Sequence, residues 1–157
     1  MKNLKTAFVA TALFAIATPF AAQAQSTYDD TQQLIAQIQA DKRAVVLEAM
    51  ALDDAQVAAF TPIYDAYQAE RKVLMQRGTD LINAYASNFG SMTDDAAKSL
   101  LKDWFKLKND ELALVQKYAK KFDKVLPTTK VLRFVQVENK LNTLLSLPGI
   151  ANIPLAK

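Results

Sequence analysis

Three adjacent pairs of carboxylates within 53–126 are the residues of this sequence best suited to chemistry: Asp53 and Asp54, Asp94 and Asp95, Asp110 and Glu111. Paired carboxylates can act as general acid and base, or supply oxygen ligands to a divalent cation. The first two pairs stand where helices are predicted to begin. The third pair consists of neighbours on a predicted helix, so its side chains diverge. There is also no His, the commonest general base and metal ligand. We therefore expect no enzyme, no metal and no cofactor.

A basic cluster is the second candidate for function. Four lysines fall within about two helical turns: Lys117, Lys120, Lys121 and Lys124. Two further basic residues, Lys130 and Arg133, follow close by in the sequence. They could bind an acidic partner or anionic headgroups. The alternative is favourable charge at a helix C-terminus together with ordinary solubility. Phe105 lies off the predicted seam between helices, so it could contact another helix, a second subunit or a client. These seven residues form the candidate partner-binding surface.

Residues 1–24 have the pattern of a secretory signal peptide. Lys2 and Lys5 precede a mostly apolar stretch over 6–16, and Ala22, Gln23 and Ala24 form a small-residue cleavage site. An uncleaved membrane anchor is the alternative, but the apolar run is shorter than the roughly 20 residues that a span needs. The pattern predicts export to the periplasm, a single domain over 25–157, and no stable membrane span after cleavage.

The charge of the predicted mature chain is almost balanced. Nineteen basic residues less Lys2 and Lys5 leave 17, against 16 acidic residues, which gives +1. A nearly neutral exported protein is a poor candidate for binding nucleic acid. There is no Cys, so no disulfide stabilises the fold despite the oxidising compartment.

The hydrophobic pattern predicts an all-α protein of four helices. Two long amphipathic helices, about 53–89 and 93–126, form a kinked antiparallel hairpin around 90–92, flanked by a shorter helix at each end. The flanking helices are expected over 31 to about 50 and from Thr128 or Thr129 to about 145, where Pro148 and Gly149 stop the last one. Gly90 suits a left-handed cap. Pro62 predicts a kink, or a fresh helix start with Thr61 as cap.

The start of the first hairpin arm carries the most informative motif. Asp53 is a good N-cap, and Gln56 can return a hydrogen bond to the amide of the cap, which completes a capping box. Leu52 before the cap can form a hydrophobic staple. Met92 and Thr93 repeat the staple residue and the cap at the second arm, where no Gln follows.

Reflecting one arm onto the other through residue 91 predicts which side chains face each other: Phe60 with Phe122, Tyr64 with Tyr118, Tyr67 with Val115, Gly78 with Trp104, and Arg71 with Glu111. The Gly–Trp pair is interpreted as packing, with a flexible joint as the alternative. The charged pair could be a buried ion pair that fixes register, or two side chains that extend to the edge of the seam. Eight aromatic residues could line a ligand groove but are more typical of a core: Phe60, Tyr64, Tyr67, Trp104, Phe105, Tyr118, Phe122 and Phe134.

Residues 52–56 resemble the LTxxQ motif of the Spy/CpxP-like periplasmic proteins, with Asp53 in place of the usual Thr. Residues 92–96 are similar to a second copy that keeps Thr93 and lacks the Gln. The resemblance implies a cradle-shaped helical dimer in the periplasm. It also implies either ATP-independent holding of unfolded clients or inhibitory contact with an envelope-stress sensor. Metal-sensing relatives rely on His ligands, which this sequence lacks.

The sequence and this resemblance together favour a periplasmic binding protein. The first hypothesis is an ATP-independent chaperone or envelope-stress protein that holds unfolded or acidic clients. The alternatives are an adaptor or regulator of one envelope partner, such as a sensor domain, and a structural component of the envelope.

Overall fold

The structure is a computed structural model that describes residues 33, 36, 38, 40–150 and 153–156. Within these residues it has no strand and assigns four α-helices and one short 3-10 helix: α2 (Lys42–Met50), α3 (Asp54–Asn88), η1 (Phe89–Ser91), α4 (Asp94–Phe122) and α5 (Thr128–Ile150). The predicted all-α class, with a long hairpin between shorter helices, is confirmed. The predicted signal peptide lies outside the described residues.

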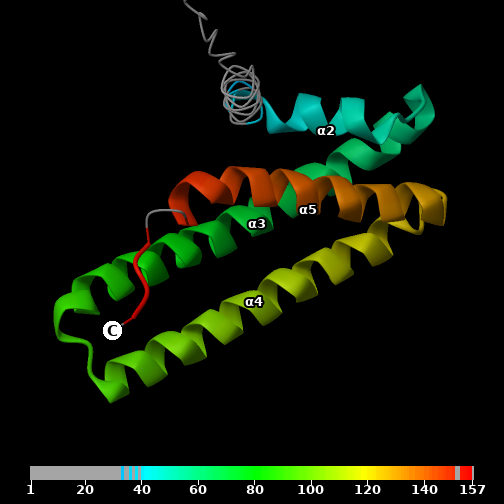
Figure 1. The fold of residues 1–157 in the computed structure, drawn as a ribbon. Coiled ribbons are helices and arrows are strands. Elements are labelled where there is room, and N and C mark those ends of the chain that lie inside the picture. The colour runs from blue at the N-terminus through cyan, green and yellow to red at the C-terminus, as the bar shows by residue number, and fades with distance from the viewer. Residues whose placement is uncertain (1–32, 34–35, 37, 39, 151–152, 157) are drawn as a thin grey trace, which may run out of the picture. The chain divides into compact units, whose positions relative to one another are not determined.

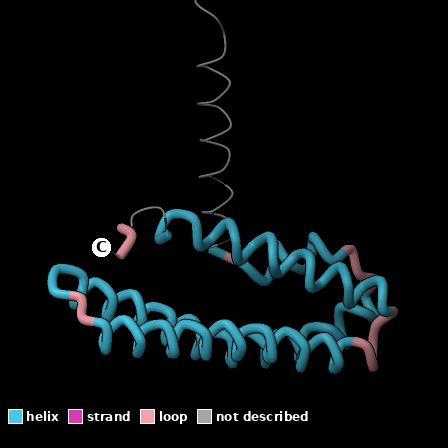
Figure 2. Tube along the Cα trace, turned by 60° about the horizontal axis from the view of Figure 1, so that its bottom comes forward, coloured by secondary structure: helices cyan, strands magenta, loops and turns pink. Residues whose placement is uncertain are grey.

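The hairpin consists of α3 and α4, which run antiparallel and side by side and are joined through η1 (Figures 1 and 2). α5 follows α4 and packs against the half of the hairpin that is remote from η1, and α2 packs on α5. α3 is continuous through Pro62, so the alternative of a fresh start at that residue is wrong. A kink there stays a prediction.

The N-caps of both predicted helix-start motifs are confirmed. The Asp53 carboxylate accepts from the Gln56 amide at 2.8 Å, and the Gln56 side-chain oxygen accepts from the Asp53 amide at 3.3 Å. Thr93 Oγ1 accepts from the Ala96 amide at 3.2 Å, with no reciprocal bond. Leu52 is half-buried against the core, as a staple residue should be. These residues therefore begin the two long helices.

Several predicted helix ends are wrong. The first helix does not run unbroken to Met50, because Asp41 leaves the helical conformation and caps α2 through its carboxylate. Gly90 does not adopt a positive φ; the chain turns through η1 instead, and the left-handed residue is Ala51, at φ 49°. α4 ends at Phe122 rather than near 126, because Leu126 precedes a proline and is biased away from the helical region.

The last helix also differs from its prediction at both ends. The Pro127 carbonyl accepts from the Lys130 and Val131 amides, so Pro127 occupies the cap position. Thr128 does not act as the cap, because its hydroxyl donates to Asp123 at 2.8 Å. The helix continues through Pro148 to Ile150, since the fixed φ of proline is helical and only one backbone bond is lost.

The core is an aromatic cluster centred on Phe134 of α5, which is fully buried. Its ring lies 4.5–6.5 Å, between centroids, from four rings of the hairpin: Phe60, Tyr64, Tyr67 and Phe122. Tyr118 completes the cluster against Tyr67. The core interpretation of the aromatic residues is thus confirmed for these six; Trp104 and Phe105 are exposed.

The pairing of side chains across the hairpin agrees with reflection through residue 91 only at the end remote from η1. Phe60 stacks on Phe122 with centroids 4.8 Å apart, as predicted. Further along, Tyr67 instead of Tyr64 meets Tyr118, because Tyr64 packs between Phe60 and Phe134. The following contacts are offset by the same three residues: Gly78 lies against Leu107 and not against Trp104, so the predicted Gly–Trp packing is wrong.

Gly78→Ala is expected to stabilise the protein. A Cβ at Gly78 would lie 3.6 Å from Leu107 Cδ2, an ordinary contact, and the residue has no positive φ. Alanine in a helix interior is favoured over glycine by about 1 kcal/mol. We expect the melting temperature, followed by circular dichroism, to rise by about 3 °C. A fall would show that the arms need the close approach that only glycine allows.

Candidate functional site

The most unusual side chain in the described structure is Glu138, a buried carboxylate on α5. Four groups from α2 and α3 donate to it: the Lys42 ammonium at 2.8 Å, the Tyr64 hydroxyl at 3.0 Å, the Tyr67 hydroxyl at 3.2 Å and the Gln68 amide at 3.3 Å. The Lys42 ammonium also donates to Asn142 at 3.2 Å. The network therefore joins three helices.

Burial governs the electrostatics of this network. Desolvation lowers the pKa of Lys42, and the attraction of Glu138 opposes that shift. Desolvation, followed by the proximity of Glu138, raises the pKa of Tyr64 and of Tyr67, so both hydroxyls keep their protons and stay donors. Among the described residues, no buried side-chain nitrogen or oxygen lacks a partner. The network is internally satisfied, which is the behaviour of a structural site.

Sequence reasoning missed this network, although a signal was present. Phe134, Glu138 and Leu141 follow the spacing of one helical face, so a carboxylate stands at a core position of α5. Tyr64 and Tyr67 supply two hydroxyls at core positions of α3. The pattern could have indicated a buried acid with phenolic donors, but not that Lys42 of another helix would join it.

Two members of the predicted basic surface form hydrogen bonds to the C-terminal end of α2. Lys130 donates to the carbonyls of Met50 and Ala51, and Arg133 Nε donates to the Ala49 carbonyl at 2.6 Å. These carbonyls lie at the C-terminal end of α2, where the helix dipole is negative and backbone acceptors lack helical partners. Lys130 and Arg133 therefore hold the end of α2 against α5.

The lysines of α4 are also divided in their roles. Lys117 lies 2.7 Å from both carboxylate oxygens of Glu70 on α3. The hydrogen bonds that Lys117 and Tyr118 donate to Glu70 lower the pKa of its carboxyl. Burial, together with the bond to Glu70, raises the pKa of Tyr118 to about 12. Lys121 lies over the Tyr118 ring at 4.4 Å. Lys120 and Lys124 are exposed. The predicted six-residue basic surface is thus not a uniform free patch.

Arg71 and Glu111 do not pair across the hairpin, so the first of the two alternatives, a buried pair that fixes register, is wrong. Arg71 donates to the Met75 sulfur at 2.9 Å and Glu111 accepts from Lys108 at 2.8 Å, each within its own helix. The charges that bridge the arms lie on the other side of the seam. There, Asp110 accepts from Arg77 at 2.7 Å and from Lys106 at 3.2 Å, which lowers its pKa. The shift in register explains the exchange of partners.

The same side of the hairpin carries two shallow grooves, of about 380 and 600 Å³. Acidic and basic residues alternate along them: Glu70, Arg77, Asp80, Asp103, Lys106, Asp110 and Lys117. Because the pairs Arg77–Asp110 and Lys117–Glu70 already neutralise much of this charge, the grooves offer no strong field of one sign.

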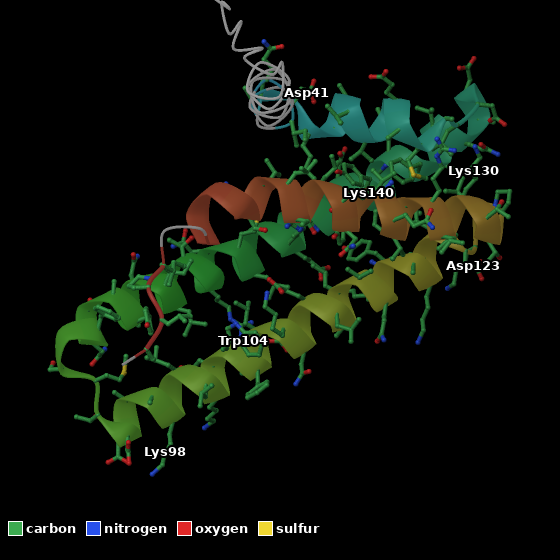
Figure 3. The ribbon with its side chains drawn as sticks, in the orientation of Figure 1. Asp41, Lys98, Trp104, Asp123, Lys130 and Lys140 are labelled. Carbon is green, nitrogen blue, oxygen red and sulfur yellow. The ribbon has the colours of Figure 1, made fainter. Side chains whose placement is uncertain are left out.

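The opposite side of the hairpin is apolar and is the better candidate site. Four side chains there are about half exposed, and we call this surface the open face: Met75 (53%), Ile82 (46%), Leu101 (56%) and Trp104 (46%). Met75 and Ile82 continue, in helical steps, the side of α3 on which Tyr67 packs against α5. On α4, Trp104 stands seven residues before Glu111 and eleven before Val115, so it shares their side of the helix (Figure 3). α5 covers the remote half of this side, and the open face is the half near η1.

Phe105 borders the open face. It is 57% exposed, and its ring meets the Trp104 ring edge-on with centroids 5.0 Å apart. Leu112, two turns further along α4, is 58% exposed and extends the apolar surface. The position of Phe105 off the seam agrees with its prediction, while its contact with a subunit or a client stays a prediction.

The apolar C-terminal segment 153–156 also reaches this side. The Tyr85 hydroxyl on α3 donates to the Pro154 carbonyl at 2.8 Å, and the Tyr85 ring packs near Phe89 at 5.8 Å between centroids. Ile153 is half-buried and Leu155 is 90% exposed. The segment thus lies on α3 but leaves the Leu155 side chain in solvent.

The part of the chain that the structure describes has no cluster of three or more metal-ligating side chains. None of its helices is long and apolar enough to span a bilayer. A scan against protein-family models and searches of curated proteins and of solved structures find no match to this chain.

Proposed function

We propose that the protein is a periplasmic, Spy/CpxP-like binding protein that holds unfolded clients on the open face without ATP. The observation that carries the proposal is the cluster of four half-exposed apolar side chains, Met75, Ile82, Leu101 and Trp104, on two paired helices. Exposed apolar side chains that gather on one surface mark interaction sites more often than scattered ones do. The capping motif at 52–56, which resembles the LTxxQ motif of that family, supports the same assignment.

The composition of the open face suits variable partners. Met75 is flexible and polarisable, so it can repack against different side chains. Trp104 provides a large contact area and is a residue type enriched at binding hot spots. Arg71 lies one turn before Met75 on α3 and donates to its sulfur. This cation would favour clients that carry acidic residues beside apolar ones, and a homodimer could enlarge the surface.

An adaptor or regulator of one envelope partner is the second candidate. The exposed edge-on pair of Trp104 and Phe105 favours it, because a compact aromatic pair can anchor a single specific interface. Crosslinking from whole cells separates the two: one dominant product supports the adaptor, and a broad distribution of products supports the chaperone.

The test of the chaperone proposal compares two matched double variants of the mature chain. Ile82→Ser with Trp104→Ser removes half of the open face. Val73→Ser with Leu132→Ser removes two apolar side chains that are more exposed, at 62% and 59%, from other surfaces. We expect the wild type and the control to suppress light scattering by a denatured client at nearly equimolar concentration. The open-face variant should bind the client at least tenfold more weakly.

Circular dichroism must show that both variants keep the wild-type helix content. If the two lose client binding equally, general surface hydrophobicity, and not the open face, is responsible. If the wild type fails to suppress aggregation at low and at high salt, the chaperone proposal is wrong.

A further inference from the structure

The C-terminal segment 153–156 lies beside the open face. Tyr85, whose hydroxyl holds the Pro154 carbonyl, follows Ile82 of the open face by three residues on α3, so the two share a side of the helix. Figure 1 shows this red segment passing over α3 towards α4. The segment belongs to no helix or strand and is apolar: Ile153, Pro154, Leu155 and Ala156. It has the chemistry that an unfolded client would present.

The segment is held loosely by the contacts that the structure shows. Its described hydrogen bond is the one from Tyr85, and Leu155 remains 90% exposed. A hydroxyl that donates to a backbone carbonyl does not recognise any particular side chain. The carbonyl of any extended peptide could therefore replace that of Pro154. Such a contact favours exchange over permanent closure.

We propose that the C-terminal segment is a tethered competitor for the open face, which an extended apolar client segment must displace. The inference rests on the proposed function, since it concerns the same surface. Only residues 151 and 152 separate the segment from the end of α5, so its local concentration near the face is high. A client that needs the free face therefore binds with an apparent affinity reduced by the fraction of time that the segment is bound.

The experiment uses the mature chain in four forms: wild type, a chain ending at Ile150, Tyr85→Phe, and the full-length Ile153→Ser with Leu155→Ser. The probe is one denatured client, whose dissociation constant is measured for each form. We expect the truncated chain and the serine variant to bind the client about three- to tenfold more tightly than the wild type. Tyr85→Phe should stay close to the wild type, because the lost hydroxyl would serve the segment and the client alike.

A second measurement follows the segment without any client. The Ile82 side-chain methyl resonance should shift on truncation and return when a synthetic peptide of residues 151–157 is added to the truncated chain. The Ile63 methyl, elsewhere on α3, serves as the unaffected reference.

The outcomes separate the two proposals. Equal client affinity in all four forms overturns the competitor proposal and leaves the proposed function standing. An Ile82 resonance that neither truncation nor the peptide moves also overturns it. Absence of client binding in every form overturns the proposed function, and the competitor role fails with it, even where the Ile82 resonance shows that the segment docks.

Discussion

Glu138→Ala is expected to lower the free energy of unfolding by about 3–5 kcal/mol, because it leaves the partly buried ammonium of Lys42 without its counter-charge. The hydroxyls of Tyr64 and Tyr67 also lose their acceptor. Domains of this size are stable by roughly 5–15 kcal/mol, so the variant should be close to unfolding. Urea denaturation followed by circular dichroism measures the loss.

Glu48→Ala is the matched control for this prediction. Glu48 is an exposed glutamate on α2, and its replacement should change stability by less than about 0.5 kcal/mol. Lys42→Met in the Glu138→Ala background should recover part of the loss, since it removes the unpaired charge. If Glu138→Ala costs no more than the control, then the carboxylate contributes nothing as a buried acceptor.

Phe134→Ala is expected to cost a further large amount, about 3–5 kcal/mol in the otherwise wild-type chain. The ring is fully buried and contacts rings from both arms of the hairpin, so its removal leaves a cavity where α5 meets α3 and α4. Chemical denaturation again provides the measurement.

Leu132→Ala is its control, two residues away on the same helix and 59% exposed. It should be nearly neutral. Similar losses for both variants would show that α5 is held to the hairpin by general helix stability and not by the aromatic cluster.

The local features of this fold could be predicted from the sequence because their determinants are close along the chain. Asp53 and Gln56 interact over three residues, so their capping box could be read directly from the sequence. The aromatic stripe of α3 also follows from helical spacing alone. Reflection of the arms gave the correct partner only for Phe60, since it assumes that both helices advance equally along the seam. The offset that brings Gly78 against Leu107 depends on tertiary packing, which helical periodicity does not encode.

The site was less predictable for the same reason. Lys130 and Arg133 look like part of a basic patch in the sequence, yet they bind carbonyls of a helix some 80 residues earlier in the chain. Charge spacing shows that side chains share a face, but not which element lies opposite them. Phe105 could be predicted as an off-seam residue because the seam itself has a regular period, whereas the exposure of Trp104 follows from the register that reflection missed.

The pairing of Lys42 with Glu138 joins residues 96 positions apart and therefore bears on how the chain folds. The hairpin can form from neighbouring segments, but Glu138 gains its full set of donors only when α2, α3 and α5 have all assembled. A partly folded chain that buried Glu138 without α2 would pay the desolvation cost of the carboxylate without the compensating charge of Lys42. The network therefore penalises intermediates and couples the two ends of the described fold into one cooperative transition, which coincident denaturation curves from circular dichroism and Trp104 fluorescence would reveal.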